Sequence, residues 1–329
     1  RTQWSIAARL GATYFFDETN TGGVGLGANS VNNRINSDSN LNYTLNHRIS
    51  DRLRFRSTGG VAYQLEPNLQ SGLASNRQLG EYLSWSTDNS IGYEINPRFG
   101  VVLGYRFAGI NYSDFNIEDR YNSTIYTQLR YKASDRTVIT GNYRYATSHN
   151  NQAADSESHF VTAGIEHRFS PTSVVTFQAG AQFRDSDLGN SNTSPFAELG
   201  LSTRLTPQLS ARLFSRLMQE DGELASPGLL PGQYGSRLVW RSGLSTSYIV
   251  SPELSLNGGL TFISSSWEDG TAGLSDFDEQ TLNLNIGFAY QVYSNLTITG
   301  SYNYSTTFSD ADFREFDRNR FMLGVQTSF

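Results

Sequence analysis

The sequence contains no cysteine and only two methionines in 329 residues. Without cysteine the chain has no thiol nucleophile and forms no disulfide bond. Its four histidines, His47, His149, His159 and His167, have no serine or aspartate at a spacing that indicates a catalytic constellation. We therefore expect no enzymatic activity, no catalytic or metal-binding residues and no cofactor.

Long apolar runs are also missing. No stretch approaches the eighteen consecutive apolar residues of a transmembrane helix, and the mean hydropathy is −0.43. Low mean hydropathy does not exclude a membrane protein, because membrane-spanning β-strands alternate apolar and polar residues. Because the chain begins with Arg1, we expect that a preceding segment such as a signal peptide has been removed.

What the sequence does contain is alternation at period two, which is typical of β-strands. The first stretch places an apolar residue at every even position from Trp4 to Phe16. The last stretch, 320–329, has Phe321, Leu323, Val325, Thr327 and Phe329 on one face and ends on an aromatic residue. This ending resembles the C-terminal signal of outer-membrane barrels, whose last strand closes against the first and faces lipid. The resemblance implies that Phe321, Leu323, Val325 and Phe329 form an assembly signal.

A short connection recurs along the chain. In each case Ser, Thr or Asn with Pro or Asp makes a tight turn, and an apolar residue on either side re-enters the stripe. The connections are 49–53, 95–99, 133–137, 169–173, 205–209, 250–254 and, more loosely, 292–296. Between them lie eight longer polar connections. Seven short and eight long connections join sixteen strands, with both termini on the short-turn side.

The same stripes could face the core of a soluble β-sandwich. Three features favour a membrane barrel instead. Short and long connections alternate strictly, and aromatic residues gather near both strand ends. Charge is nearly absent from the stripes, with His47 beside a turn as the exception. We predict an all-β fold: a transmembrane up-and-down antiparallel β-barrel of sixteen strands, with short periplasmic turns and longer external loops. It would form a single domain over residues 1–329 in the bacterial outer membrane.

The opposite faces of the strands would line the lumen, and their charge is uneven. The acids expected to point inward are only Asp88, Glu94, Glu166 and Glu198, because most others, including Glu220, are expected in loops. Strands after Arg241 should present Ser, Thr, Asn, Gln and Gly. The predicted pore-lining basic residues are Arg9, Arg48, Arg54, Arg56, Arg106, Arg130, Lys132, Arg144, Arg168, Arg184, Arg204, Arg212, Arg216 and Arg241.

These bases outnumber the inward acids, so mutual neutralisation can absorb only some of them. A sixteen-stranded barrel leaves a water-filled channel unless it is plugged. An arginine-rich wall concentrates anions and binds carboxylate, sulfate or phosphate. The acidic loop stretches around Asp278 and Asp310 could instead hold Ca²⁺ at surface lipid, although solvated acids are the simpler interpretation.

The turn-strand pattern, for example 205–210 and 250–255, also resembles the family of β-barrel outer-membrane porins found with exopolysaccharide genes. This resemblance implies passive passage of anionic solutes or export of an anionic polysaccharide, and it assigns no individual residue. Expected partners are outer-membrane lipid and lipopolysaccharide, the barrel-assembly machinery, periplasmic export proteins and the anionic solute or polysaccharide, with no nucleic acid. The alternative is a plugged barrel that acts as a scaffold or adhesin-like partner of an envelope complex.

Overall fold

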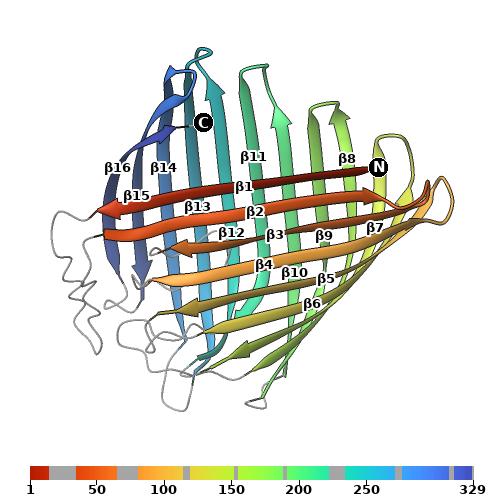
Figure 1. Ribbon diagram of the computed structural model, residues 1–329. Coiled ribbons are helices and arrows are strands. Elements are labelled where there is room, and N and C mark those ends of the chain that lie inside the picture. The colour runs from red at the N-terminus through yellow and green to blue at the C-terminus, as the bar shows by residue number, and fades with distance from the viewer. Residues whose placement is uncertain are drawn as a thin grey trace.

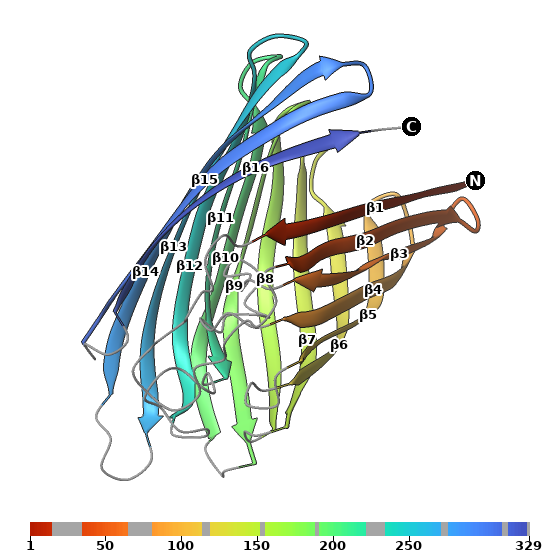
Figure 2. The ribbon, with the colours of Figure 1, turned by 60° about the vertical axis from the view of Figure 1, so that its left-hand side comes forward.

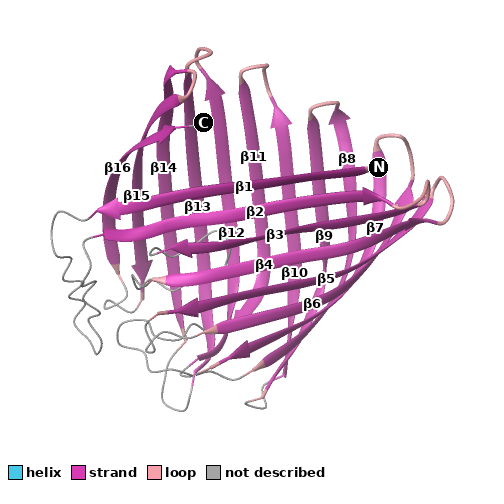
Figure 3. Cartoon of the chain, viewed as in Figure 1, coloured by secondary structure: helices cyan, strands magenta, loops and turns pink. Residues whose placement is uncertain are grey.

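The structure is a computed structural model. It describes residues 1–14, 35–64, 81–113, 119–151, 155–187, 191–221, 234–270, 276–310 and 315–327. Within these ranges every regular element is a strand (Figure 3), and no helix is present that could cross a membrane.

Sixteen strands form one antiparallel sheet in which each strand pairs with its neighbours in the sequence (Figure 1). The predicted up-and-down fold is confirmed. The strands are β1 (Thr2–Tyr14), β2 (Ile35–Arg48), β3 (Leu53–Gln64), β4 (Tyr82–Glu94), β5 (Phe99–Tyr112), β6 (Arg120–Lys132), β7 (Thr137–Asn150), β8 (Ser156–Ser170), β9 (Ser173–Ser186), β10 (Ser191–Arg204), β11 (Leu209–Asp221), β12 (Tyr234–Ile249), β13 (Leu254–Gly270), β14 (Phe277–Tyr293), β15 (Leu296–Ser309) and β16 (Phe316–Thr327).

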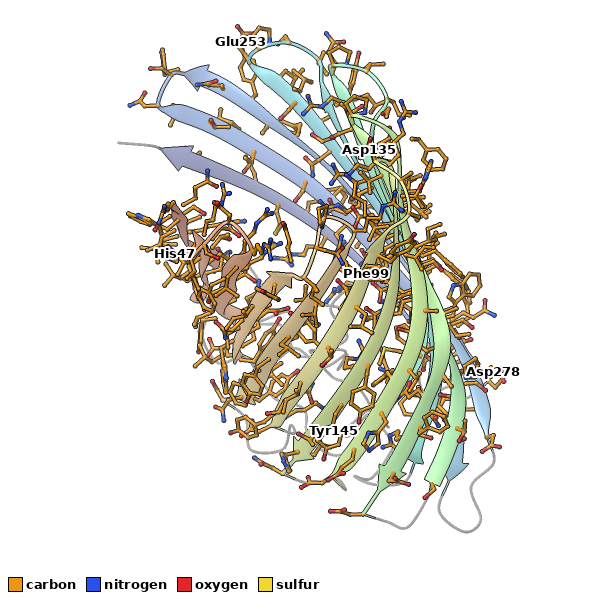
Figure 4. The ribbon with its side chains drawn as sticks, turned by 90° about the vertical axis from the view of Figure 1, so that its right-hand side faces the viewer. His47, Phe99, Asp135, Tyr145, Glu253 and Asp278 are labelled. Carbon is orange, nitrogen blue, oxygen red and sulfur yellow. The ribbon has the colours of Figure 1, made fainter. Side chains whose placement is uncertain are left out.

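The short turns have the chemistry that their sequence predicts. The Ser50 hydroxyl accepts a hydrogen bond from the Leu53 amide at 3.1 Å, and Ser251 does the same for Leu254 at 3.1 Å. Thr206 accepts from Leu209 at 3.0 Å. Asp135 and Glu253, in two of these turns, lie toward one end of the molecule, and Tyr145 and Asp278 lie toward the other (Figure 4). We call these the turn end and the loop end.

The sheet curls round, so that the first strands pass across the front of the later ones (Figures 1 and 2). The expected pairing of first and last strands is not present: β1 and β16 are the two edges of the sheet (Figure 2). Their outward side chains are the most exposed apolar groups, with Leu10 at 88% and Leu323 at 80%. An unpaired edge leaves backbone donors and acceptors without partners, which hydrocarbon does not tolerate. The edges therefore need a partner in a bilayer.

The outer face of the sheet is apolar and exposed. Leu103, Ile125, Leu129 and Val161 are between 54% and 60% exposed, and exposed apolar side chains recur on every strand from β3 to β15 except β10. Soluble monomers rarely expose contiguous apolar patches of more than a few hundred Å². The strands are also 12 to 17 residues long, more than the roughly 9–11 that a transmembrane strand needs. This face is built to contact lipid.

The hydrogen-bonded pairing of β10 with β11 stops before the two strands end, and we call this break the seam. β10 and β11 pair only from Ala197↔Leu217 to Arg204↔Ser210, although both strands continue toward the loop end. The next hydrogen-bonding position on β10 is Pro195, which has no N–H to donate. The side-chain amide of Gln182 on β9 takes its place: it accepts from the Gln219 N–H and donates to the Gln219 carbonyl, both at 3.0 Å. Gln182 is 1% exposed, so one amide side chain closes the gap left by Pro195.

We expect Gln182→Leu to lower the free energy of unfolding by about 1–3 kcal/mol, because the N–H and carbonyl of Gln219 would lose their partner. Urea titration in detergent micelles would measure the loss. Adding Pro195→Ala to this variant supplies the missing N–H and should recover much of the stability. Unchanged stability in Gln182→Leu would show that the seam does not depend on this side chain.

Candidate functional site

The inner face of the sheet carries nearly all of the strand charge. It is the concave face of the curled sheet, and some of its polar side chains reach across an intervening strand. Tyr126 on β6 donates to Asp88 on β4 at 2.7 Å, and Arg130 on β6 meets Glu166 on β8 at 3.2 Å. Every basic residue predicted to line the pore alternates with outward apolar neighbours, so it falls on this face of its strand.

Several of these bases form ion pairs with acids among the described residues. Arg54 meets Glu94 at 2.8 Å, and Arg106 binds Asp88 with both Nε at 3.1 Å and Nη2 at 2.7 Å. Two further bases meet turn acids, Arg48 with Asp51 and Lys132 with Asp135, at 2.8 and 2.7 Å. The hydrogen bond from Lys132 lowers the pKa of Asp135, which lies in a turn outside the strands. Arg130 and Arg168 share Glu166, and Arg241 is paired as described below.

Arg9, Arg56, Arg204 and Arg212 make no ion pair or side-chain hydrogen bond with any residue in the part of the chain that the structure describes. Arg216 lies directly opposite Glu198 of β10. Arg144 lies over the Phe160 ring, 3.7 Å from its centroid, and Arg184 is buried at 4% exposure. Mutual neutralisation therefore accounts for part of the basic set and leaves a positive inner wall.

The sequence analysis missed the most buried charge cluster. Glu220, expected in a loop, belongs to β11 and lies on the inner face. Arg241 of β12 binds its carboxylate with two hydrogen bonds, at 2.9 and 2.6 Å, and Arg237 adds a third at 3.1 Å. The side chains of Arg241, Arg237 and Glu220 are 1%, 5% and 12% exposed. Arg237 also lies 5.1 Å from the centroid of the Trp267 ring. We call these three charged residues the Glu220 triad.

The later strands form a mostly neutral wall from β13 to β15, as was expected. Thr281 bonds Thr307 at 2.8 Å, and Asn283 donates to Ser305 at 2.6 Å. The expectation fails at Glu279 of β14, a buried acid at 4% exposure on the same face. It also fails at β16, where Arg318 and Arg320 alternate with the outward residues and so fall on the inner face.

The inner face differs between its two ends. Near the loop end of β8–β13 its side chains are buried, with Phe160, Phe196, Val239 and Trp267 at 4%, 2%, 0% and 0% exposure. Near the turn end, Arg204 and Arg212 are exposed. Solvent therefore reaches the arginines of the turn end and is excluded from the inner wall at the loop end.

The predicted assembly signal lies on the outer face of β16. Phe321, Leu323 and Val325 are 80%, 80% and 70% exposed, and Phe321 packs on Tyr302 of β15 at 4.8 Å between ring centroids. Phe329 lies outside the described residues.

We also looked for catalytic or metal-binding groups among the described residues. His149 contacts Asp155 at 2.6 Å, a partner that spacing did not reveal, and the pair lies at the exposed loop end. Asp278 and Asp310 come together across β14 and β15, where the Asp278 amide donates to the Asp310 carboxylate at 3.1 Å. Over the described ranges no group of three His, Asp or Glu side chains converges as a metal site would require.

An up-and-down sheet with a lipid-facing apolar outer surface and a charged inner surface defines the class: the protein is a β-barrel of the bacterial outer membrane. The comparison of sequences narrows this further. Residues 231–329, which contain β12 to β16, match the model of the family described as "Putative beta-barrel porin 2". The resemblance expected from the turn-strand pattern is confirmed over this part of the chain. No curated protein sequence matches the chain.

A comparison with solved structures finds outer-membrane receptors and transporters. The siderophore receptor PirA from Pseudomonas aeruginosa is 10% identical with a TM-score of 0.41, covering 99% of this chain and 62% of the receptor. The unliganded ferric citrate transporter FecA is 13% identical with a TM-score of 0.47, covering 88% and 55%. The FrpB iron transporter from Neisseria meningitidis (F5-1 variant) is 7% identical with a TM-score of 0.47, covering 84% and 54%. The chain thus spans less than two thirds of each receptor, and likeness at this level says nothing about what the chain carries.

Proposed function

We propose that the protein is a passive, non-enzymatic pore of the outer membrane that favours anions, either as small solutes or as the charged groups of an exported polysaccharide. The observation that carries this proposal is the set of inner-face arginines without a described acidic partner: Arg9, Arg56, Arg204 and Arg212. Fixed positive charge on a water-filled wall raises the local anion concentration and repels cations. In this proposal the turn end faces the periplasm, where export partners would meet it.

A reversal-potential measurement in planar bilayers tests the proposal. In a KCl gradient at low salt the Debye length is about 30 Å, so the field of the arginines extends across the lumen and chloride should be preferred. In molar KCl the length falls to about 3 Å and the preference should fade. Preference for potassium in the unmodified protein would overturn the proposal.

The pairing pattern supplies a matched control. Replacing Arg56, Arg204 and Arg212 with Gln removes uncompensated charge and should reduce the chloride preference. Replacing both members of the Arg54–Glu94 pair with Gln removes two charges that cancel, so selectivity should stay unchanged. Equal effects of the two variants would show that ion pairing does not determine which arginines act.

A second candidate, the plugged scaffold, is favoured by the burial of inner-face side chains at the loop end, including Val239 and Trp267. It predicts no conductance in the same bilayers. The conductance measurement therefore separates the two functions before any selectivity is measured.

A further inference from the structure

Three neighbouring strands, β10, β11 and β12, place their inner residues in regular rows. At the turn end the first row is Arg204–Ser210–Ser247, and the second is Ser202–Arg212–Ser245. The third row is Gly200–Phe214–Gly243, and the fourth is Glu198–Arg216–Arg241. Successive rows are two residues apart along each strand, about 6.8 Å. Arginines thus recur in the first, second and fourth rows, on three different strands, with serine hydroxyls, the Phe214 ring and Glu198 among them. We call these four rows together the column.

The first two rows line an open basin of about 600 Å³, a size typical of ligand sites. Ser202, Ser210, Ser245 and Ser247 contribute hydroxyl groups to its wall. Arg204 and Arg212 are exposed in it, and neither guanidinium has a partner among the residues that the structure places. Because Arg204 lies opposite Ser210 and Arg212 opposite Ser202, the two arginines are diagonal neighbours on adjacent strands. Their side chains can therefore converge on one anionic group.

The third row adds a flat apolar surface. Gly243 lies directly across from Phe214, and a Cβ atom at this glycine would collide with the Phe214 ring. The ring therefore lies over the glycine, on the inner wall beside the basin. A side chain at this position would have to displace the ring.

We propose that this column, from the basin to Phe214, binds sugar acids: saccharide units that carry a carboxylate. Arg204 and Arg212 bind the carboxylate, since guanidinium forks match carboxylate geometry. The serine hydroxyls bond the sugar hydroxyls, and the Phe214 ring packs against the apolar face of the next unit. The role of the column in transport rests on the proposed pore, but its ligand preference does not. Neither the neutral wall of β13–β15 nor the paired Arg54 offers this combination of groups.

Binding is measured by calorimetry on the detergent-solubilised full chain, which needs no conductance. The probes are a short oligomer of galacturonic acid, a neutral glucose oligomer of equal length, and acetate. We expect the acidic oligomer to bind most tightly. Replacing Arg204 or Arg212 with Gln should weaken its binding about tenfold each, the effect of losing one charge-assisted hydrogen bond. The Arg54→Gln, Glu94→Gln double variant should bind as the unmodified protein does.

The Phe214→Ala variant distinguishes the contribution of sugar packing from that of the carboxylate. It should weaken binding of the oligomer but not of acetate. Equal binding of acidic and neutral oligomers, acetate bound as tightly as the acidic oligomer, or full binding in the Arg204 and Arg212 variants would each overturn the site. Bilayer recordings with the same oligomers add an independent readout. Absence of conductance together with intact binding would refute the pore and leave the site standing, whereas anion-selective conductance without oligomer binding would do the reverse.

Discussion

Replacing Glu220 with Gln should destabilise the barrel by about 3–5 kcal/mol, the cost of leaving buried charge without its partner. The carboxylate accepts three hydrogen bonds from Arg237 and Arg241, whose side chains are 5% and 1% exposed. An amide cannot balance two guanidinium charges. Urea unfolding followed by tryptophan fluorescence would measure the loss, and one of the four tryptophans, Trp267, lies against Arg237.

The matched control is Asp51→Asn. It also removes an acid that meets an arginine, at 2.8 Å, but Asp51 is 94% exposed and Arg48 is 54% exposed. Exposed pairs contribute little, so no measurable change is expected. A second variant separates charge from shape: Glu220→Gln combined with Arg237→Met and Arg241→Met removes all three charges and should recover much of the lost stability. A Glu220→Gln protein as stable as the unmodified one would contradict a structural role for the triad.

The strands and turns were predictable because their signals are local. Alternation at period two needs only a few residues, and each turn is made by its own serine, threonine or asparagine, as Ser50 and Thr206 show. Sixteen strands follow from counting such units. The same alternation assigns each residue of a strand to the inner or the outer face.

The pairing of charges was not predictable, because it depends on register between strands. Arg130 and Glu166 are separated by a whole strand, and nothing in their local sequence connects them. Glu220 was assigned to a loop because the apolar stripe of its strand ends at Leu217, while the strand itself continues to Asp221. Arg237 and Arg241, four residues apart on one face of a strand, were the signal that an acid should lie opposite.

The Pro195 seam has a similar origin. A proline near the end of a polar stretch predicts the end of a strand, yet β10 extends past it to Ser191. The strand persists because it still pairs with β9, and because Gln182 satisfies the neighbour that Pro195 cannot. Such a side-chain substitute for a backbone amide leaves no periodic mark in the sequence.

The largest structural question in the membrane is the fate of the two edges, β1 and β16. We expect them to pair, since lipid offers no other hydrogen-bond partners to their backbones. β1 runs away from the turn end and β16 runs toward it, so the pairing would be antiparallel like every other in the sheet. Outward residues of β1 have even numbers and those of β16 have odd numbers. Any register that keeps the apolar faces together therefore pairs an even position with an odd one.

Pairing of β1 with β16 can be tested with introduced cysteines that form a disulfide bond. The chain has no cysteine of its own that would interfere. Directly opposed residues have Cβ atoms about 4.5–5.5 Å apart, which is within reach of a disulfide after small shifts. Ala8→Cys should cross-link with Leu323→Cys or Val325→Cys in the folded protein and change its mobility in non-reducing gels. Ala8→Cys with Gly324→Cys, which points to the opposite face, should not. Cross-linking of neither outward pair would show that the two edges do not meet in either of these registers. Equal cross-linking of the Gly324 pair would show that they meet without a fixed register.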